Sequence, residues 1–325
     1  MREAHFIDKN KNKWLEIEAN LKNKTKINPD ILASNYIEIT NDLAYAQTYY
    51  PKSKTKDYLN ELTLFAHQSI YKDQKIDQNL LLDFVLYKVP KAAYLNRKML
   101  LFSFIVFTFF TLIGLLSSIY DINFVRQILG NEYVEMSLDN IKKGDPAAVY
   151  KGSSEIGSSI GITINNIKVA FYAFVSGLFF SVGTGYILMQ NGIMLGAFHY
   201  MFLKEGVLAK AMTGIWIHGT IEISVIIIAG ACGFILGNGF IFPGTFSRKE
   251  NFILKTKQAI TILLSTIPLF IIAGFLEGFV SRHYDVNIFI SLSIIVSSVY
   301  LIVFYYIIFP IKQAKKYQWN IKTLS

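Results

Sequence analysis

Apolar and polar positions divide this chain into two parts. Residues 1–98 alternate charged and apolar side chains, whereas from Met99 onward the chain forms long apolar runs separated by short polar stretches. The run 99–119 contains no charged residue. A helix of about 20 residues spans about 30 Å, the thickness of the hydrocarbon core of a bilayer. This run therefore predicts a first transmembrane helix.

Later apolar runs predict further crossings. They lie at about 169–189, 211–236, 258–280 and 288–309. A shorter run at 191–203 is predicted to be either a thin sixth span or a re-entrant helix. The expected fold class is all-α: a polytopic transmembrane helix bundle with about six spans, one of them short or re-entrant.

Basic residues predict the orientation, because short loops rich in lysine and arginine stay in the cytoplasm. Residues 1–98 carry 16 basic side chains, and the tail 311–325 has lysines but no acid. The loop 238–257 is also basic, whereas the loop 121–165 has six acids against four bases and is expected outside. Six spans satisfy every loop. The sequence thus predicts a multi-pass protein of the cytoplasmic membrane with both termini in the cytoplasm.

Three domains follow from these boundaries. They are a cytoplasmic helical bundle with an interfacial helix (1–98), a transmembrane helical domain (99–310) with the external loop 121–165, and a basic cytoplasmic tail (311–325). The amphipathic, aromatic segment 77–98 is expected to lie along the membrane surface.

Helix signals support the amino-terminal bundle. Asn28-Pro29-Asp30 combines a capping residue, a first-turn proline and an early acid, and Pro51 ends the apolar stripe that follows. Thr55 is expected to cap a second helix. The tyrosines 45, 49 and 50 belong either to the bundle core or to a docking patch for a partner.

Composition narrows the function classes. Hydrophobic residues make up 52% of the chain, which favours a membrane protein. Most of the basic residues behind the net charge of +9 border the predicted spans. Membrane orientation and contact with anionic lipids explain basic residues at such positions, so nucleic-acid binding is not expected. Cys232 is the single cysteine, and an intramolecular disulfide is thereby excluded.

Three ionisable residues interrupt the apolar runs. His218 and Glu222 lie four positions apart, so a helix places them on one face, and Glu277 lies in a second run. A buried charge in hydrocarbon needs a partner or a function. We expect these three to form an intramembrane polar cluster, with His199, Arg282 and His283 as candidate residues at its rim.

This cluster has three alternative interpretations. One histidine and two carboxylates suit a divalent cation such as zinc, manganese or iron, held by His218, Glu222 and Glu277. Alternatively, the histidine bonds to a carboxylate and clamps helices together. In the third interpretation, the cluster lines a path for protons or substrate.

Glycines in the apolar runs favour close helix packing, as in the pair Gly233 and Gly237. Gly192, Gly219 and Gly239 are also candidates for helix breaks at which backbone groups line a cavity. The small-residue faces make a homodimer plausible.

Several short sequence motifs are spread over residues 2–310. They are Arg2-Glu3 followed by Trp14, DLAYAQTYYP from Asp42, QNG from Gln190, HGTIE from His218, GNGFIFPGTFSR from Gly237 and AGFLEGFVSR from Ala273. In these motifs the chain resembles the stage II sporulation protein M family of bacterial and archaeal membrane proteins. The resemblance implies a multi-span core. It also implies a scaffold-like component of an envelope complex, as in the family's named member, which takes part in septal cell-wall remodelling during engulfment in spore formation.

Three functions remain open. The first is a noncatalytic membrane component of the cell envelope, a scaffold that binds other membrane or envelope proteins. The second is a transporter or channel that uses the His/Glu cluster. The third is an intramembrane metal-dependent hydrolase. The sequence contains no P-loop and no HExxH motif, which favours a protein that is not an enzyme.

Overall fold

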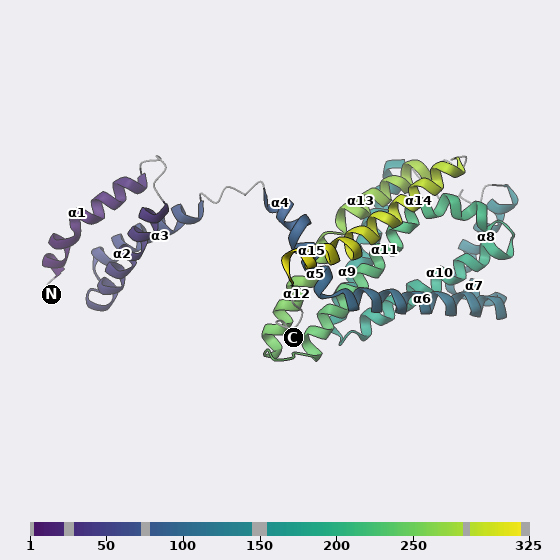
Figure 1. Cartoon of the computed structure of the whole chain (residues 1–325), viewed down its shortest axis with the longest axis horizontal. Coiled ribbons are helices and arrows are strands. Elements are labelled where there is room, and N and C mark those ends of the chain that lie inside the picture. The colour runs from purple at the N-terminus through teal and green to yellow at the C-terminus, as the bar shows by residue number, and fades with distance from the viewer. Residues whose placement is uncertain (1–2, 23–28, 73–78, 145–154, 282–286, 320–325) are drawn as a thin grey trace. The chain divides into compact units, whose positions relative to one another are not determined.

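The structure is a computed structural model that describes residues 3–22, 29–72, 79–144, 155–281 and 287–319. All regular secondary structure in these residues is helical. The described chain divides into two compact units, Met1–Leu81 and Leu82–Ser325 (Figure 1). Each unit is described here by itself.

The amino-terminal unit contains three long helices, drawn in purple and blue in Figure 1: α1 (Glu3–Lys22), α2 (Pro29–Tyr49) and α3 (Lys54–Lys72). Helix α2 starts at the predicted proline and ends before Pro51. The helices share one apolar core that includes Phe6, Trp14, Ile39 and Leu59. Burial of these side chains is the main source of the unit's stability.

Polar contacts fix the register of α1 against α2 and α3. The indole Nε1 of Trp14 donates a 2.8 Å hydrogen bond to Oδ2 of Asp42, and Lys13 Nζ lies 2.6 Å from the same oxygen. The hydroxyl of Tyr58 donates a 2.8 Å hydrogen bond to Oε2 of Glu18. Tyr45 and Tyr50 pack against the core, whereas Tyr49 is exposed.

The second unit begins with short helical segments and continues into long apolar helices. Its segments are α4 (Asn79–Asp83), η1 (Phe84–Lys88), α5 (Val89–Leu95), α6 (Arg97–Tyr120), α7 (Ile122–Leu129), α8 (Asn131–Lys142), α9 (Glu155–Val175), η3 (Ser176–Leu178), α10 (Val182–Lys204), α11 (Leu208–Ile241), α12 (Arg248–Leu264), α13 (Ile267–Phe275), η4 (Leu276–Ser281), α14 (Ile288–Val303), η5 (Phe304–Ile308) and α15 (Phe309–Tyr317). Three of these, η1, η4 and η5, are π-helical, and η3 is a 3₁₀ turn.

Four helical stretches of the described chain are long and apolar enough to cross a membrane: Arg97–Tyr120, Leu208–Ile241, Arg248–Ser281 and Ile288–Tyr317. They correspond to four of the predicted runs. The other two predicted crossings, 169–189 and 191–203, fall on α9, η3 and α10, which are not among these four. The count of six therefore stays a prediction.

The break between the predicted crossings 169–189 and 191–203 lies at a different place in the structure than expected. The helical path breaks at residues 179–181, where Phe180 and Ser181 have positive φ values of 52° and 66°. By contrast, α10 continues through Gln190, Asn191 and Gly192 without interruption. Asn191 satisfies its side-chain amide within the helix by donating to the carbonyl of Ile187 at 2.8 Å.

Gly192, Gly219 and Gly239 are not helix breaks: each lies inside a continuous helix, α10 or α11. Gly192 instead allows close packing of α10 on α6, since a Cβ there would lie 2.9 Å from the carbonyl oxygen of Phe107. Gly196 allows the same close packing one turn later, since a Cβ there would lie 2.2 Å from the carbonyl oxygen of Thr111. Packing therefore explains these glycines where the two helices meet.

Helix α11 is the central element of the second unit and contacts α6, α9, α10, α12, α13 and α14 (Figure 1). Most of its side chains are buried. Two hydroxyls tie neighbouring helices together: Ser103 donates to the carbonyl of Ile227 at 2.6 Å, and Thr184 donates to that of Ala173 at 2.7 Å. Polar side chains on α11 are thus surrounded by other helices.

Segments at both ends of the bundle pack onto it. Helix α5 contacts α12 and α15 and buries Val89 and Ala93, so it packs with the second compact unit, which begins at Leu82. The predicted boundary at 98, between cytoplasmic and transmembrane residues, stays a prediction. In the loop expected outside, α7 and α8 form a cluster in which Val125 and Val134 join Phe202 and Ile215. The acidic loop is therefore partly folded onto the ends of α10 and α11.

Candidate functional site

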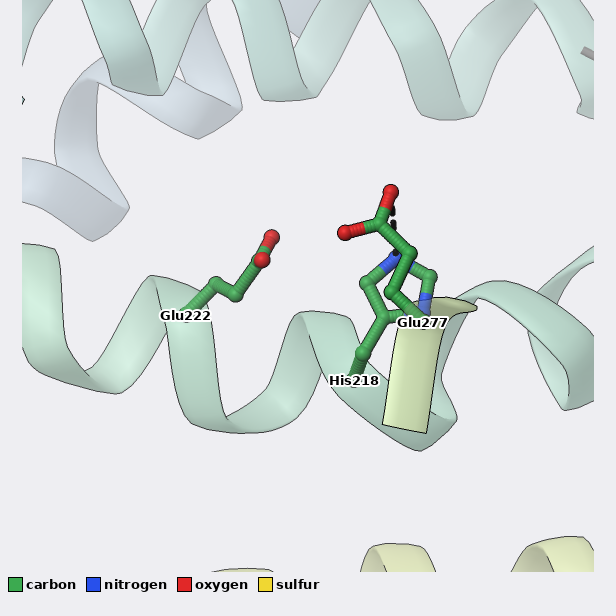
Figure 2. A group of neighbouring side chains, drawn as sticks. All are labelled: His218, Glu222 and Glu277. Carbon is green, nitrogen blue, oxygen red and sulfur yellow. Dashed lines mark ion pairs between the residues drawn. The ribbon is translucent and has the colours of Figure 1, made fainter. Parts of the chain in front are cut away.

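One turn of α11 supplies two of the three predicted cluster residues. His218 and Glu222 lie four positions apart and face the same side of this helix (Figure 2). The His218 side chain is 3% exposed, and Glu222 is partly buried. Because α11 is surrounded by other helices, both side chains point into the bundle.

The third residue comes from a π-helical turn. Glu277 lies in η4, at the end of the continuous stretch Arg248–Ser281, and it is 4% exposed. Its Oε1 lies 3.9 Å from Nε2 of His218, which is drawn as the dashed line in Figure 2. The same turn carries Ser281, whose Oγ lies 2.8 Å from Nδ1 of His218. The turn thus presents two polar side chains to one imidazole ring.

Helix α9 contributes a fourth polar group. The side-chain amide of Asn166 donates a short hydrogen bond to Oε1 of Glu222. This contact orients the Glu222 carboxylate. Neither Asn166 nor Ser281 was identified from the sequence, because both are common polar residues without a spacing that links them to His218.

The three predicted residues converge. His218, Glu222 and Glu277 each offer one ligand atom, and these three atoms lie within 4.8 Å of one another. The side chains point toward a common space in Figure 2. Among the described residues, no ordinary hydrogen-bond donor reaches the buried Oε2 of Glu277, although the Glu222 carboxyl is close enough to share a proton with Glu277. A buried polar atom without a partner is uncommon in a folded protein and needs an explanation.

Charge imposes a condition on this cluster. Two carboxylates this close inside a helix bundle repel each other unless a proton is shared or a cation lies between them. Ligands held about 2.1 Å from a tetrahedral cation are about 3.4 Å apart. The 3.9 Å separation of His218 Nε2 and Glu277 Oε1 is near that value and is too long for a direct hydrogen bond. Small side-chain movements would complete a three-ligand site.

The candidate rim residues do not join the cluster in the described structure. His199 is on α10, where its Nδ1–H donates to the carbonyl of Leu195 at 2.7 Å and its Nε2 accepts from Trp216 Nε1 at 3.2 Å. This histidine has partners of its own. Arg282 and His283 lie outside the described residues.

Comparisons with known proteins give few relatives. An uncharacterized protein of Methanocaldococcus jannaschii is 24% identical over 200 residues, which cover 60% of this chain and 86% of that protein. No solved structure matches the chain.

Two family models match separate parts of the chain. Residues 4–72 match a domain of unknown function, DUF8413, and these residues form α1 to α3. Residues 103–282 match the model for stage II sporulation protein M. The second match covers more than half of the chain and includes His218, Glu222 and Glu277. The chain belongs to the stage II sporulation protein M family and is a multi-pass membrane protein.

Proposed function

We propose that the transmembrane unit binds one divalent cation, of the zinc, manganese or iron class, and uses this site to move the cation across the membrane. The observation that carries the proposal is the convergence of one imidazole and two carboxylates on a buried point between α11 and η4. Imidazole and carboxylate are suitable ligands for these cations. Ionisable groups inside membrane spans commonly mark ion pathways.

The unpartnered Oε2 of Glu277 favours a cation site over a polar clamp. A clamp would satisfy this oxygen only through a proton shared with the Glu222 carboxyl, and an unsatisfied buried polar atom costs about 1–3 kcal/mol. A bound cation would engage this carboxylate and neutralise its repulsion with Glu222. A hydrolase would need the same cation and, in addition, a binding site for its substrate.

Metal content and flux test this proposal separately. Purified protein loaded with Zn²⁺ or Mn²⁺ is expected to retain one equivalent by elemental mass spectrometry, and H218A, E222Q and E277Q are expected to lose it. H199A is the matched control, since His199 is a partly buried histidine of the same bundle with partners outside the cluster. Retention of metal by all three cluster variants would refute the site. Binding without Zn²⁺ or Mn²⁺ uptake into proteoliposomes would refute the transport role alone.

A second candidate function is partner binding by the amino-terminal unit, as expected of an envelope scaffold. It is favoured by a separate core in α1 to α3 and by large apolar side chains on the surface, such as Ile37 and Leu64, which are 60% and 55% exposed. A photo-crosslinking residue at either position is expected to capture a protein in cells. Lys52 and Asn60, exposed polar positions of the same unit, serve as controls. The mass of the product distinguishes a homodimer from another envelope protein.

We also propose six crossings with both termini in the cytoplasm. The acidic loop around α8 and the basic loop before α12 would then lie on opposite sides of the membrane. The native Cys232 is fully buried, so it is not expected to react with a cysteine label and needs no replacement in a labelling experiment. A membrane-impermeant maleimide applied to intact cells is expected to label K143C and not K249C. The reverse pattern would invert the topology.

A further inference from the structure

A groove lies at the end of the second unit where three chain segments meet. Its volume is about 540 Å³. The walls come from the turn after η3, the carboxyl end of α11 and the first turns of α12, through Leu178, Phe180, Leu236, Phe240 and Phe252. Two positively charged side chains, Arg248 and Lys249, complete the lining. The groove lies apart from the His/Glu cluster.

Backbone geometry creates the groove. Phe180 and Ser181 adopt left-handed backbone conformations that reverse the chain between η3 and α10. Gly237 closes the gap to α11, since a Cβ there would lie 2.6 Å from the carbonyl oxygen of Gly177. Phe180 and Phe240 then pack edge to face, with ring centroids 5.7 Å apart. The result is a fixed apolar surface.

The two cations at this groove have no acidic partner in the part of the chain that the structure describes. Among the described residues, neither Arg248 nor Lys249 forms an ion pair. The neighbouring acid, Glu250, is engaged elsewhere, because its Oε2 accepts from the hydroxyl of Ser247 at 2.7 Å and from the Ser247 backbone N–H at 3.2 Å. Both cations are exposed at the start of a membrane-spanning stretch.

We propose that this groove binds one anionic phospholipid of the bilayer, with an acyl chain along the apolar wall and the phosphate at Arg248 and Lys249. The wall is almost entirely apolar, which suits a hydrocarbon chain and not a soluble anion. The charge at the mouth is complementary to a negative headgroup. Exposed aromatic residues at the same end, Phe179, Phe242 and Phe246, are typical of a segment at the level of the lipid headgroups.

Lipid retention tests the proposal. Purified full-length protein is titrated with phosphatidylglycerol and phosphatidylcholine of the same acyl chains, and bound lipids are counted by native mass spectrometry. Each basic residue near a membrane surface contributes about fivefold to the affinity for anionic lipid. The R248Q/K249Q double variant is therefore expected to lose roughly 30-fold in affinity for phosphatidylglycerol and little for phosphatidylcholine.

Two further variants make the result decisive. K142Q/K143Q removes the same charge from two exposed residues at the carboxyl end of α8 and is expected to leave lipid affinity unchanged. F240A shortens the apolar wall and is expected to weaken both lipids. Equal binding of the two lipids by the native protein, or equal losses in both double variants, would overturn the proposal. Displacement of the lipid by inorganic phosphate at millimolar concentration would show a free-anion site and would also overturn it.

Discussion

The hydroxyl of Ser281 lies 2.8 Å from Nδ1 of His218, while Nε2 of the same ring faces Glu277. A hydroxyl on one ring nitrogen fixes the orientation of the imidazole and leaves the other nitrogen for a ligand or a partner. Ser281 is therefore a positioning residue for the proposed cation site.

Replacing Ser281 is expected to weaken cation binding without abolishing it. S281A frees the His218 ring, and loss of such an orienting contact typically costs 10–100-fold in metal affinity. S281T keeps the hydroxyl and is expected to bind Zn²⁺ nearly as the native protein does. Competition titration of the purified protein with a fluorescent chelator measures both affinities.

The control for Ser281 is Ser224, whose hydroxyl donates at 2.7 Å to the carbonyl of Thr220 in its own helix. S224A is expected to leave Zn²⁺ affinity unchanged. If S281A also bound Zn²⁺ at native strength, the serine would have no positioning role.

Gly196 is expected to be essential for packing α10 against α6. The added Cβ in G196V would lie 2.2 Å from the carbonyl oxygen of Thr111. This neighbour is a backbone atom of α6, which cannot move aside as the end of a flexible side chain can. Overpacking of this kind costs about 1–3 kcal/mol, so the apparent melting temperature in detergent is expected to fall by about 5 °C or more.

Gly185 on the same helix provides the comparison, because its added Cβ would meet no atom within 4 Å among those described. G185A is expected to keep or slightly raise the melting temperature, as alanine favours helix over glycine. Equal destabilisation by the two substitutions would contradict contact with α6 as the cause.

Tyr58 in the amino-terminal unit is expected to lose its proton at a higher pH than an ordinary tyrosine. Burial, and then its hydrogen bond to Glu18, raises the pKa of Tyr58 to about 12. The folded value lies above the ordinary tyrosine value of about 10, so this interaction stabilises the unit below pH 10. Its contribution is lost as the pH rises from about 10 to 12.

The difference in absorbance at 295 nm between the native protein and Y58F measures this titration. It is expected to show one phenolate forming near pH 12. Y49F removes an exposed tyrosine and serves as the reference. A Tyr58 phenolate that forms near pH 10 would contradict the buried hydrogen bond.

Hydropathy predicted the four described helical stretches that are long and apolar enough to cross a membrane, because hydrocarbon-length apolar runs have few alternatives in folded proteins. It located the break between α9 and α10 wrongly. The true break is at residues 179–181, and an apolar sequence there gives no sign of left-handed backbone at Phe180 and Ser181. The QNG phrase looks like a turn, but the helix satisfies Asn191 internally.

The candidate site was predictable in part. Spacing places His218 and Glu222 on one helical face, and the rarity of acids in apolar runs identifies Glu277. The contribution of Ser281 depends on a π-helical turn, which periodicity does not reveal. Asn166 depends on how α9 packs against α11, a contact between distant parts of the chain.

The π-helical turn η4 sets the direction in which the following side chains point around the helix axis, and the site depends on that direction. A residue adds about 100° of rotation in an α-helix, so one residue more or less in this turn rotates the chain on its far side by about that angle. Deleting Gly278 would swing the hydroxyl of Ser281 away from the imidazole while Glu277 stayed near it. A twist within this single turn can thus remove the contact that orients His218 while the imidazole and both carboxyl groups stay in place.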